Sequence, residues 1–202
     1  MMIGGYVVQK WEMFGIRGWI VAFLTGSLLT AQVGFQEAVS LSAAIAGVVM
    51  LVGALSNALG GLLSDRFGRA NTIIAVMAGS GLLSLLIGWT RAFPLWAVLI
   101  LSLVYGFMVT GDSSVLSTGI TELAHPGGLG RTMALQSLLG FGAASVSPIV
   151  FGYVLDLTNP SNALDKLGYV PNWGWAFMML GIGGVVGPLI MWLMKRGEKR
   201  QI

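Results

Sequence analysis

The sequence predicts an all-α membrane protein built from six membrane-spanning helices. Of its 202 residues only 9% are charged and 55% are hydrophobic, and the mean hydropathy is +0.83. Ordinary soluble domains carry about 25% charged residues, so a chain this poor in charge cannot cover a water-exposed surface. Seven Trp and 30 Gly are also typical of membrane helices, since Trp favours the lipid–water interface and glycine allows close helix packing.

Five of the spans are placed directly by hydropathy. A spanning helix needs roughly 20 mostly apolar residues. The stretches that satisfy this are residues 41–63, 70–89, 94–118, 132–155 and 173–194. Polar residues gather in the breaks between them, and no second domain is evident, so we expect one six-helix domain over residues 1–202.

The first span has two interpretations. Residues 18–35 are free of charge, but Lys10, Glu12 and Arg17 precede them. A helix that begins near Arg17 leaves these charges in water, and then only about two residues remain for the turn into the second span. A helix over residues 3–25 holds all three charges in the membrane and leaves a comfortable loop. We prefer the second interpretation, in which the chain begins almost inside a helix and an upstream segment is expected.

The distribution of basic residues predicts the orientation. Six spans place both termini on one side of the membrane. That side carries seven basic residues: Arg66, Arg69, Arg131, Lys195, Arg196, Lys199 and Arg200. The other side carries Arg91 and Lys166. By the positive-inside rule both termini are cytoplasmic, in a plasma or bacterial inner membrane.

Composition also argues against several classes of function. Without Cys there is no disulfide scaffold, thiolate metal site or cysteine catalysis. No cluster of metal ligands is evident, so we expect neither a metal site nor a cofactor. The net charge of +3 comes largely from the basic flank of the last span, and it does not predict nucleic-acid binding.

The residues from Gly61 to Arg69 read Gly-Leu-Leu-Ser-Asp-Arg-Phe-Gly-Arg and connect two spans. Gly61 permits close helix packing, and Gly68 permits a left-handed turn. Asp65 ends its helix, where the dipole disfavours an anion, so it needs an outside partner such as Arg66, Arg69 or the N-terminus of a neighbouring helix. The alternative is an ordinary basic loop that only fixes the orientation.

This stretch resembles the signature loop of the major facilitator superfamily, G-x-x-x-D-R/K-x-G-R/K. One departure is Ala70, where the family often has a further basic residue. A second stretch, from Glu122 to Arg131, resembles the E-x-x-x-P-x-x-x-x-R pattern at the end of the fourth helix of each half. The resemblance implies that Glu122 faces Arg69 and that the two act as a gate. The alternative is that Glu122 is solvated in its loop.

The superfamily is built from two six-helix halves. Residues 6–23, residues 142–156 and the Trp173-Gly174-Trp175 start of the last span resemble the seventh, eleventh and twelfth helices of some members. The resemblance implies that the chain is the C-terminal half of a transporter. Its partners would be the lipid bilayer, a small-molecule substrate, protons, and either a missing N-terminal half or a second copy.

Asp112 is the first candidate for substrate or proton binding, because ionisable residues in a membrane are costly and mark functional sites. It lies ten residues before Glu122, or about 15 Å along a helix, near the midplane where carriers hold their substrates. Neighbouring hydroxyls, among them Ser113, surround it in the sequence. The alternative is an Asp112 that these hydroxyls and a neighbouring helix satisfy without a function.

The first span supplies the other candidates. Tyr6, Lys10 and Arg17 recur at helical spacing and form one polar stripe, with Glu12 roughly opposite Lys10. If the span begins near Ile3, one of these faces lines a cavity that binds substrate or protons. If the span begins later, all four side chains lie in water.

We therefore predict a secondary transporter, half or fragment, that moves a small solute by alternating access, with proton symport implied by the resemblance and by the acidic residues. One alternative is a non-transporting or self-dimerising six-helix protein. An intramembrane hydrolase with Ser113 acting through His125 is disfavoured, because these residues are separated by about 18 Å along a continuous helix. No enzymatic activity is expected.

Overall fold

The computed structural model describes residues 1–125, 127–159, 170 and 172–198, and in this part of the chain every regular element is helical. Among these described residues, six segments are long and apolar enough to cross a membrane, as predicted. The elements are α1 (Met2–Thr30), α2 (Phe35–Phe67), α3 (Arg69–Ile87), the short 3₁₀ helix η1 (Thr90–Ala92), α4 (Leu95–Thr110), α5 (Ser113–Leu123), α6 (Leu129–Thr158) and α8 (Gly174–Glu198).

The first helix begins at Met2, so Lys10, Glu12 and Arg17 are all helical, as in the interpretation with a span over residues 3–25. Most helices are longer than the apolar stretches that indicate them. α1 continues to Thr30, and α5 continues past the predicted loop start to include Glu122. Hydropathy marks only the part of a helix in the hydrocarbon layer, whereas backbone stop signals, such as glycine at the ends of α2, set the true ends.

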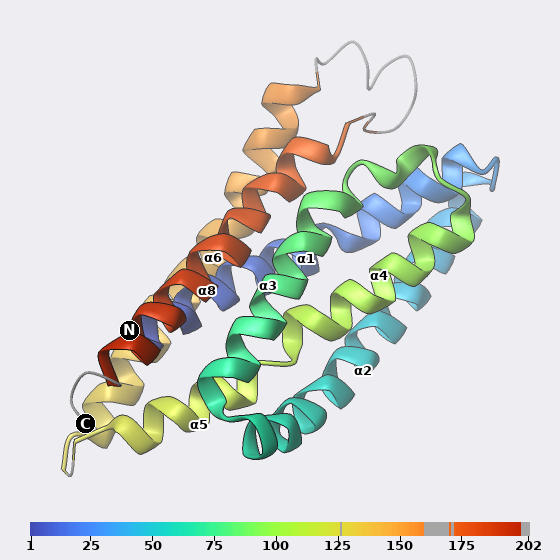
Figure 1. The fold of residues 1–202 in the computed structure, drawn as a ribbon. Helices are drawn as coiled ribbons and strands as arrows, with labels where there is room; N and C mark the ends of the chain where they lie inside the picture. The colour runs from blue at the N-terminus through green and yellow to red at the C-terminus, as the bar shows by residue number, and fades with distance from the viewer. Residues whose placement is uncertain (126, 160–169, 171, 199–202) are drawn as a thin grey trace.

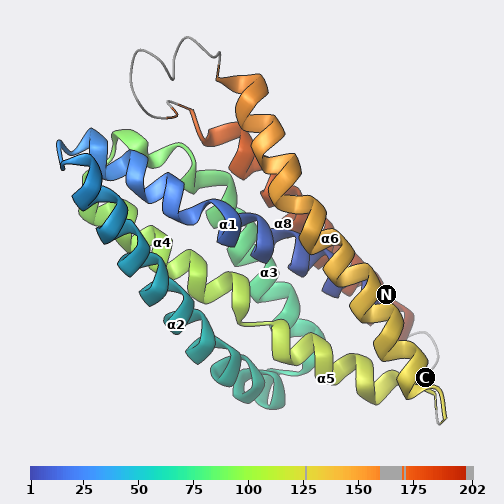
Figure 2. The same cartoon turned by 180° about the vertical axis from the view of Figure 1, so that it is seen from behind.

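The helices form one bundle with α1 at its centre (Figures 1 and 2). α1 packs mainly against α6, α8 and α2, while α3 and α8 make the most extensive contact of any pair. The N-terminus, the end of α8, the α2–α3 connection and the α5–α6 connection lie together at one end of the bundle. This is the end predicted to be cytoplasmic.

The fourth span, Leu95–Leu123, is broken in its middle. α4 ends at Thr110 and α5 begins at Ser113, so Gly111 and Asp112 form a turn inside the bundle. Backbone groups at such a break lose their helical partners, and in a membrane such irregular backbone is tolerated only where protein or a cavity covers it. The break therefore predicts a polar environment around Asp112.

Two apolar clusters fill the bundle, one toward each end. The larger contains aromatic side chains of α1, α6 and α8, including Phe23, Phe151 and Phe177. The smaller lies at the end with the N-terminus and contains Met2 and Leu116. The clusters occupy different turns of each helix, and buried polar residues of α1, α3 and the fourth span come between them in the sequence. We call these residues, together with the half-buried Ser113, the polar layer: Gln9, Lys10, Glu12, Ser80, Asp112 and Ser113.

Candidate functional site

Glu12 points from α1 into the core of the bundle and is 3% exposed. Its Oε2 accepts a hydrogen bond of 3.0 Å from the Ser80 hydroxyl of α3, while its Oε1 has no hydrogen-bond partner. The Tyr105 hydroxyl of α4 lies beside this carboxyl, but it also has no partner in hydrogen-bond geometry. A buried carboxyl with one free oxygen and no adjacent cation is a place where a proton can bind and leave with a large effect on local charge.

Asp112 is 1% exposed and lies at the turn between α4 and α5. Its Oδ1 has no hydrogen-bond partner. Two of the hydroxyls expected to surround it bond elsewhere: Thr110 donates to the Gly106 carbonyl at 3.1 Å, and Ser114 donates to the Asn57 carbonyl at 2.9 Å. Both hydroxyls therefore donate to backbone carbonyls and not to Asp112, whose Oδ1 is left without a partner.

Ser113 connects the break to α1. Its Oγ accepts hydrogen bonds from the Gln9 amide at 2.7 Å and from the Lys10 ammonium at 3.4 Å. The Gln9 amide also donates to the Val109 carbonyl at 3.1 Å, one of the backbone oxygens close to the break. α1 therefore supplies donors to the broken span. Because Ser113 directly follows Asp112 in the sequence, its contact with Lys10 brings a positive charge close to Asp112.

The two cations of the polar stripe of α1 each lie over an aromatic ring of the same helix. The Lys10 ammonium lies 4.7 Å from the centre of the Tyr6 ring, and the Arg17 guanidinium lies 5.7 Å from the centre of the Phe14 ring. Lys10 is buried, whereas Arg17 is exposed. Within the described residues neither cation has a carboxylate within ion-pair distance. Glu12 takes the other side of α1, toward α3.

Gln9, Ser80 and Tyr105 belong to this site, but sequence reasoning did not identify them. Gln9 could have been found, because an amide inside a spanning helix is costly and next to Lys10 it extends a polar patch. Ser80 and Tyr105 carry no such signal, since single hydroxyls are common in membrane helices. Only the tertiary packing brings them to Glu12: α4 contacts α1 directly, and α3 is held beside it by its contacts with α8 and α4.

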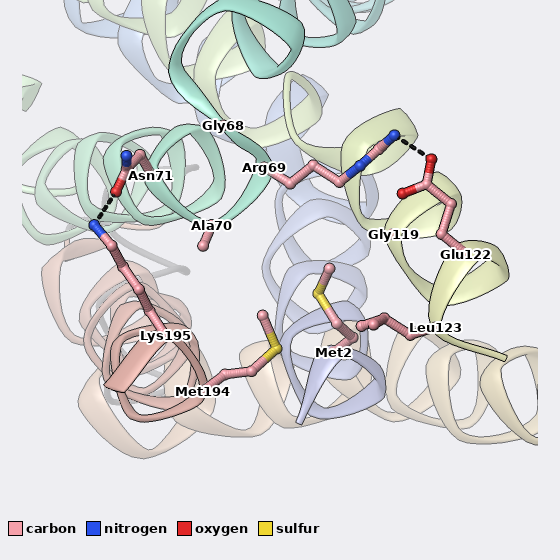
Figure 3. A pocket seen from close by; sticks show the side chains of 10 residues that line it. All are labelled: Met2, Gly68, Arg69, Ala70, Asn71, Gly119, Glu122, Leu123, Met194 and Lys195. Atoms are coloured by element: carbon pink, nitrogen blue, oxygen red, sulfur yellow. Dashed lines mark hydrogen bonds and ion pairs between the residues drawn. The ribbon is translucent and has the colours of Figure 1, made fainter. Parts of the chain in front are cut away.

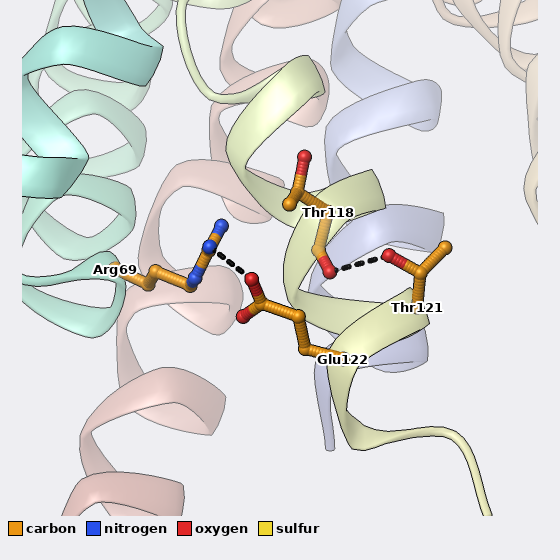
Figure 4. A network of polar contacts seen from close by, with 4 residues as sticks. All are labelled: Arg69, Thr118, Thr121 and Glu122. Atoms are coloured by element: carbon orange, nitrogen blue, oxygen red, sulfur yellow. Dashed lines mark hydrogen bonds and ion pairs between the residues drawn. The ribbon is translucent and has the colours of Figure 1, made fainter. Parts of the chain in front are cut away.

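At the end of the bundle predicted to be cytoplasmic, Arg69 opens α3 and forms an ion pair with Glu122 in the last turn of α5, which is the contact predicted from the sequence (Figure 4). The two side chains are 30% and 52% exposed. Gly68 joins α2 to α3 with φ of 85°, a conformation that glycine adopts without strain. Thr121 donates to the Thr118 carbonyl within α5 and takes no part in the pair.

The ion pair borders a pocket of about 340 Å³ between the ends of α1, α3, α5 and α8 (Figure 3). On its other side Lys195 of α8 donates a hydrogen bond to Asn71 of α3. Met2 and Met194 line the pocket between these polar pairs. Polar contacts thus connect α3 to both α5 and α8 at this end of the bundle.

The remaining residues of the signature loop differ in their surroundings. Among the described residues a side chain at Gly61 would meet nothing within 4 Å, so the close packing expected there is not seen in this part of the chain. A close approach is made instead by the preceding Gly60, which faces the Gly111 carbonyl. Arg66 lies over the Phe67 ring at 5.6 Å. Asp65 is exposed and, in the described part of the chain, its carboxylate has no ion-pair partner. The exposed Arg131 likewise forms no ion pair there.

Ser113 and His125 do not meet. Ser113 begins α5, and His125 follows its last residue, so the whole helix separates them by about 18 Å. Neither can pass a proton to the other. In the described residues no group of three or more His, Cys, Asp or Glu side chains could hold a metal ion.

The fold and the site define an all-α, multi-pass membrane protein with ionisable groups buried at a broken helix. The family model of the Major Facilitator Superfamily matches residues 13–201, and the chain therefore belongs to this superfamily.

Two curated relatives come from Bacillus subtilis (strain 168), and both are named as uncharacterized MFS-type transporters. The chain is 28% identical over 124 residues to YfnC, a match that covers 61% of this chain and 29% of that protein. It is 27% identical over 180 residues to YfiU, covering 85% of this chain and 32% of that protein. The match thus spans less than a third of either relative.

Solved structures of the xylose transporter XylE from E. coli share the fold. The partially occluded inward-open form has a TM-score of 0.67 and 20% identity, over 99% of this chain and 51% of that one. XylE described as a proton:xylose symporter, bound to 6-bromo-6-deoxy-D-glucose, has a TM-score of 0.65 and 18% identity, over 99% and 48%. The chain therefore spans about half the length of this transporter.

Proposed function

We propose that the chain forms one six-helix half, the C-terminal one, of a secondary active transporter that moves a small solute by alternating access with proton coupling. The observation that carries the proposal is the pair of buried carboxyls, Glu12 and Asp112, beside a break in the fourth span. Transporters place substrate and coupling-ion sites at discontinuous helices near the midplane of the membrane. The proton:xylose symport of XylE supports the proposal, since the same fold there performs proton coupling.

In this proposal Glu12 and Asp112 are the proton carriers. Each has one oxygen without a hydrogen-bond partner, and each is less than 5% exposed. A proton that binds there removes a charge from a region of low dielectric, where the free-energy change is larger than in water. Protonation can therefore favour one conformation over the other, which is the differential interaction that coupling requires.

The ion pair of Arg69 and Glu122 serves as a gate at the cytoplasmic end. An exposed pair contributes only about 0–1 kcal/mol, so it is not a major source of stability. Two conformations of a carrier differ by a few kcal/mol, and a contact present in only one of them shifts their populations. The other half of the transporter is either a further six-helix segment or a second copy of this chain. Asp65, exposed at this end, is available to contact it.

The surfaces of α2 and α6 are the places where this other half would pack. These two spans are the least buried of the six. In the most apolar 18-residue stretch of each, 28% is buried, against 50% for α1. They flank α1 on the side seen in Figure 2. A partner on this side would cover Arg17 and enclose a cavity that borders the polar layer.

The test of proton coupling uses the full-length product of the gene that encodes these residues, reconstituted into liposomes, with a solute found by screening labelled compounds including xylose. Asp112→Asn and Glu12→Gln should abolish uptake driven by a proton gradient, while exchange of labelled for unlabelled solute continues. Glu37→Gln is the matched control, since Glu37 is exposed in the first turn of α2. Proton-driven uptake that persists unchanged in both buried variants would contradict the proposal.

A further inference from the structure

Two cations of α1, Lys10 and Arg17, have no part in the proposed proton step. They are seven residues apart, so they lie on the same face of the helix, about 10 Å apart along its axis. A cation inside a membrane bundle is costly unless an opposite charge or a strong acceptor faces it. Their surroundings therefore indicate what binds next to them.

The protein supplies these cations with weak partners only. Lys10 has the Ser113 hydroxyl at 3.4 Å and the Tyr6 ring, with Asp112 near enough for electrostatic attraction but beyond ion-pair distance, and Arg17 has the Phe14 ring. In the described residues no carboxylate lies within ion-pair distance of either one. Glu12 cannot serve Lys10, because it projects to the opposite side of α1 and bonds to Ser80. Hydrogen-bonding capacity for an anion is thus left unused at both cations.

Arg17 is also accessible. The cavity that it borders between α1, α2 and α4 measures only about 20 Å³, which is room for about one water molecule, so a solute would meet Arg17 at the open face of α1 and not inside this cavity. Phe14, one turn before Arg17, lies edge-on to Phe141 of α6 at 6.1 Å. A ligand in this position meets a guanidinium, which can bind a carboxylate through two hydrogen bonds, next to aliphatic and aromatic surface.

The ionisable side chains of α1 and of the break in the fourth span have a net charge that depends on how many protons they bind. Between Tyr6 and Arg17 of α1 and around the break in the fourth span, the described residues carry two cations, Lys10 and Arg17, and two carboxyls, Glu12 and Asp112, while the tyrosines Tyr6 and Tyr105 are the other titratable groups. With both carboxyls ionised the region is neutral. One bound proton leaves one excess positive charge, which a single monoanion cancels.

We propose that the transported solute is a small organic anion with an apolar body, bound between Lys10 and Arg17, and that one proton accompanies each negative charge. This inference rests on the proposed function and adds the substrate class. A bound proton leaves an excess positive charge that favours binding of the anion, and a bound anion leaves an excess negative charge that favours binding of the proton. Each ligand therefore raises the affinity for the other by the same factor. Transport of a monoanion is then electrically silent.

The experiment uses the full-length protein in liposomes and two groups of labelled solutes: the monoanions lactate and benzoate, and the neutral compounds xylose and benzamide. We expect an inwardly directed proton gradient to drive uptake of at least one monoanion, with no dependence on an imposed membrane potential. Arg17→Gln and Lys10→Gln should each raise the KM for that anion roughly tenfold or more, which is the loss of one charge-assisted hydrogen bond. Arg17→Lys should recover part of the affinity, since it retains the charge.

Arg91→Gln is the control, because Arg91 lies in the short η1 helix at the opposite end of the bundle and outside the polar layer. Each variant is checked for a single monodisperse peak in size-exclusion chromatography, so misfolding is not mistaken for lost affinity. Uptake of a neutral solute without uptake of either monoanion overturns the substrate class and leaves the proposed transporter intact. Uptake of none of the four solutes counts against both. Anion uptake that follows the membrane potential overturns the one-to-one charge balance.

Discussion

At single positions, glycines set how closely α3 and α8 approach. Gly81 faces Gly184, and a Cβ atom on either one would overlap backbone atoms of the other helix, which cannot move aside as a side chain can. The approach has consequences for polar groups: the Ser84 hydroxyl of α3 reaches the Phe177 carbonyl of α8 at 2.8 Å. Close backbone contact also increases dispersion contacts, which drive helix association in a membrane.

Gly184→Ala should lower the thermal stability of the protein, because the added methyl group forces the two helices apart, at a cost of about 1–3 kcal/mol. Gly47→Ala is the matched control. Gly47 lies within α2 with nothing within 4 Å of its Cβ position, and alanine there gains about 0.5–1 kcal/mol of helix propensity. The seven Trp residues allow unfolding to be followed by intrinsic fluorescence. Equal melting temperatures for the two variants would contradict the close approach.

Between elements, α2 stabilises the broken fourth span. The Ser56 hydroxyl donates to the Phe107 carbonyl at 2.5 Å, and the backbone N–H of Ser114 donates to the Asn57 side-chain carbonyl at 3.3 Å. These bonds satisfy backbone groups near the break, which have no water to bind in the hydrocarbon layer. The hydrogen bonds from α2 therefore hold the turn that carries Asp112 in place.

Asn57→Ala should destabilise the protein by about 1 kcal/mol, since interhelical hydrogen bonds in membranes contribute roughly 0.6–2 kcal/mol. It should also lower transport, because the turn that carries Asp112 loses support from α2. Ser145→Ala is the control: its exposed hydroxyl bonds only to the Phe141 carbonyl of its own helix. Melting temperature and uptake are measured together. A variant as stable and as active as the control would show that α2 does not support the break.

At the scale of the whole molecule, the proposed gate joins α3 and α5, which carry residues of two different sequence motifs. Arg69→Glu places two carboxylates together and should impair transport severalfold. The double variant with Glu122→Arg should regain part of the rate, because the exposed pair depends on charge and not on burial. Uptake rates of both are compared with those of the unmodified transporter. If the double variant is no more active than Arg69→Glu alone, the pair is not a gate.

The asymmetry of basic residues predicts the orientation of the bundle, and the absence of Cys makes it easy to test. Gln36→Cys lies in the first turn of α2, and His125→Cys lies between α5 and α6, at the opposite end of the bundle. In intact cells a membrane-impermeant maleimide should label the former and should reach the latter only after permeabilisation. The reverse pattern would place the basic end outside and refute the positive-inside assignment.

The sequence by itself determined the class of protein, the six spans and the ends of the bundle at which Arg69 and Glu122 meet. These follow from local composition, because twenty apolar residues in a row cannot remain in water and because short motifs mark helix ends. It also singled out Asp112, since a carboxyl in an apolar stretch is conspicuous without any knowledge of packing.

Only the tertiary structure decided which side chains meet. The partners of Glu12 come from α3, and the close approach expected at Gly61 falls one residue earlier, at Gly60. The break at Asp112 could not be predicted from the sequence, because the hydropathy of this span is that of an unbroken helix. The backbone carbonyls of Phe107 and Val109 near the break accept hydrogen bonds from Ser56 of α2 and Gln9 of α1, and only the structure shows these partners. Such contacts depend on helix rotation and crossing, and in a membrane, where neighbouring lipid is as apolar as the protein core, hydropathy does not specify either.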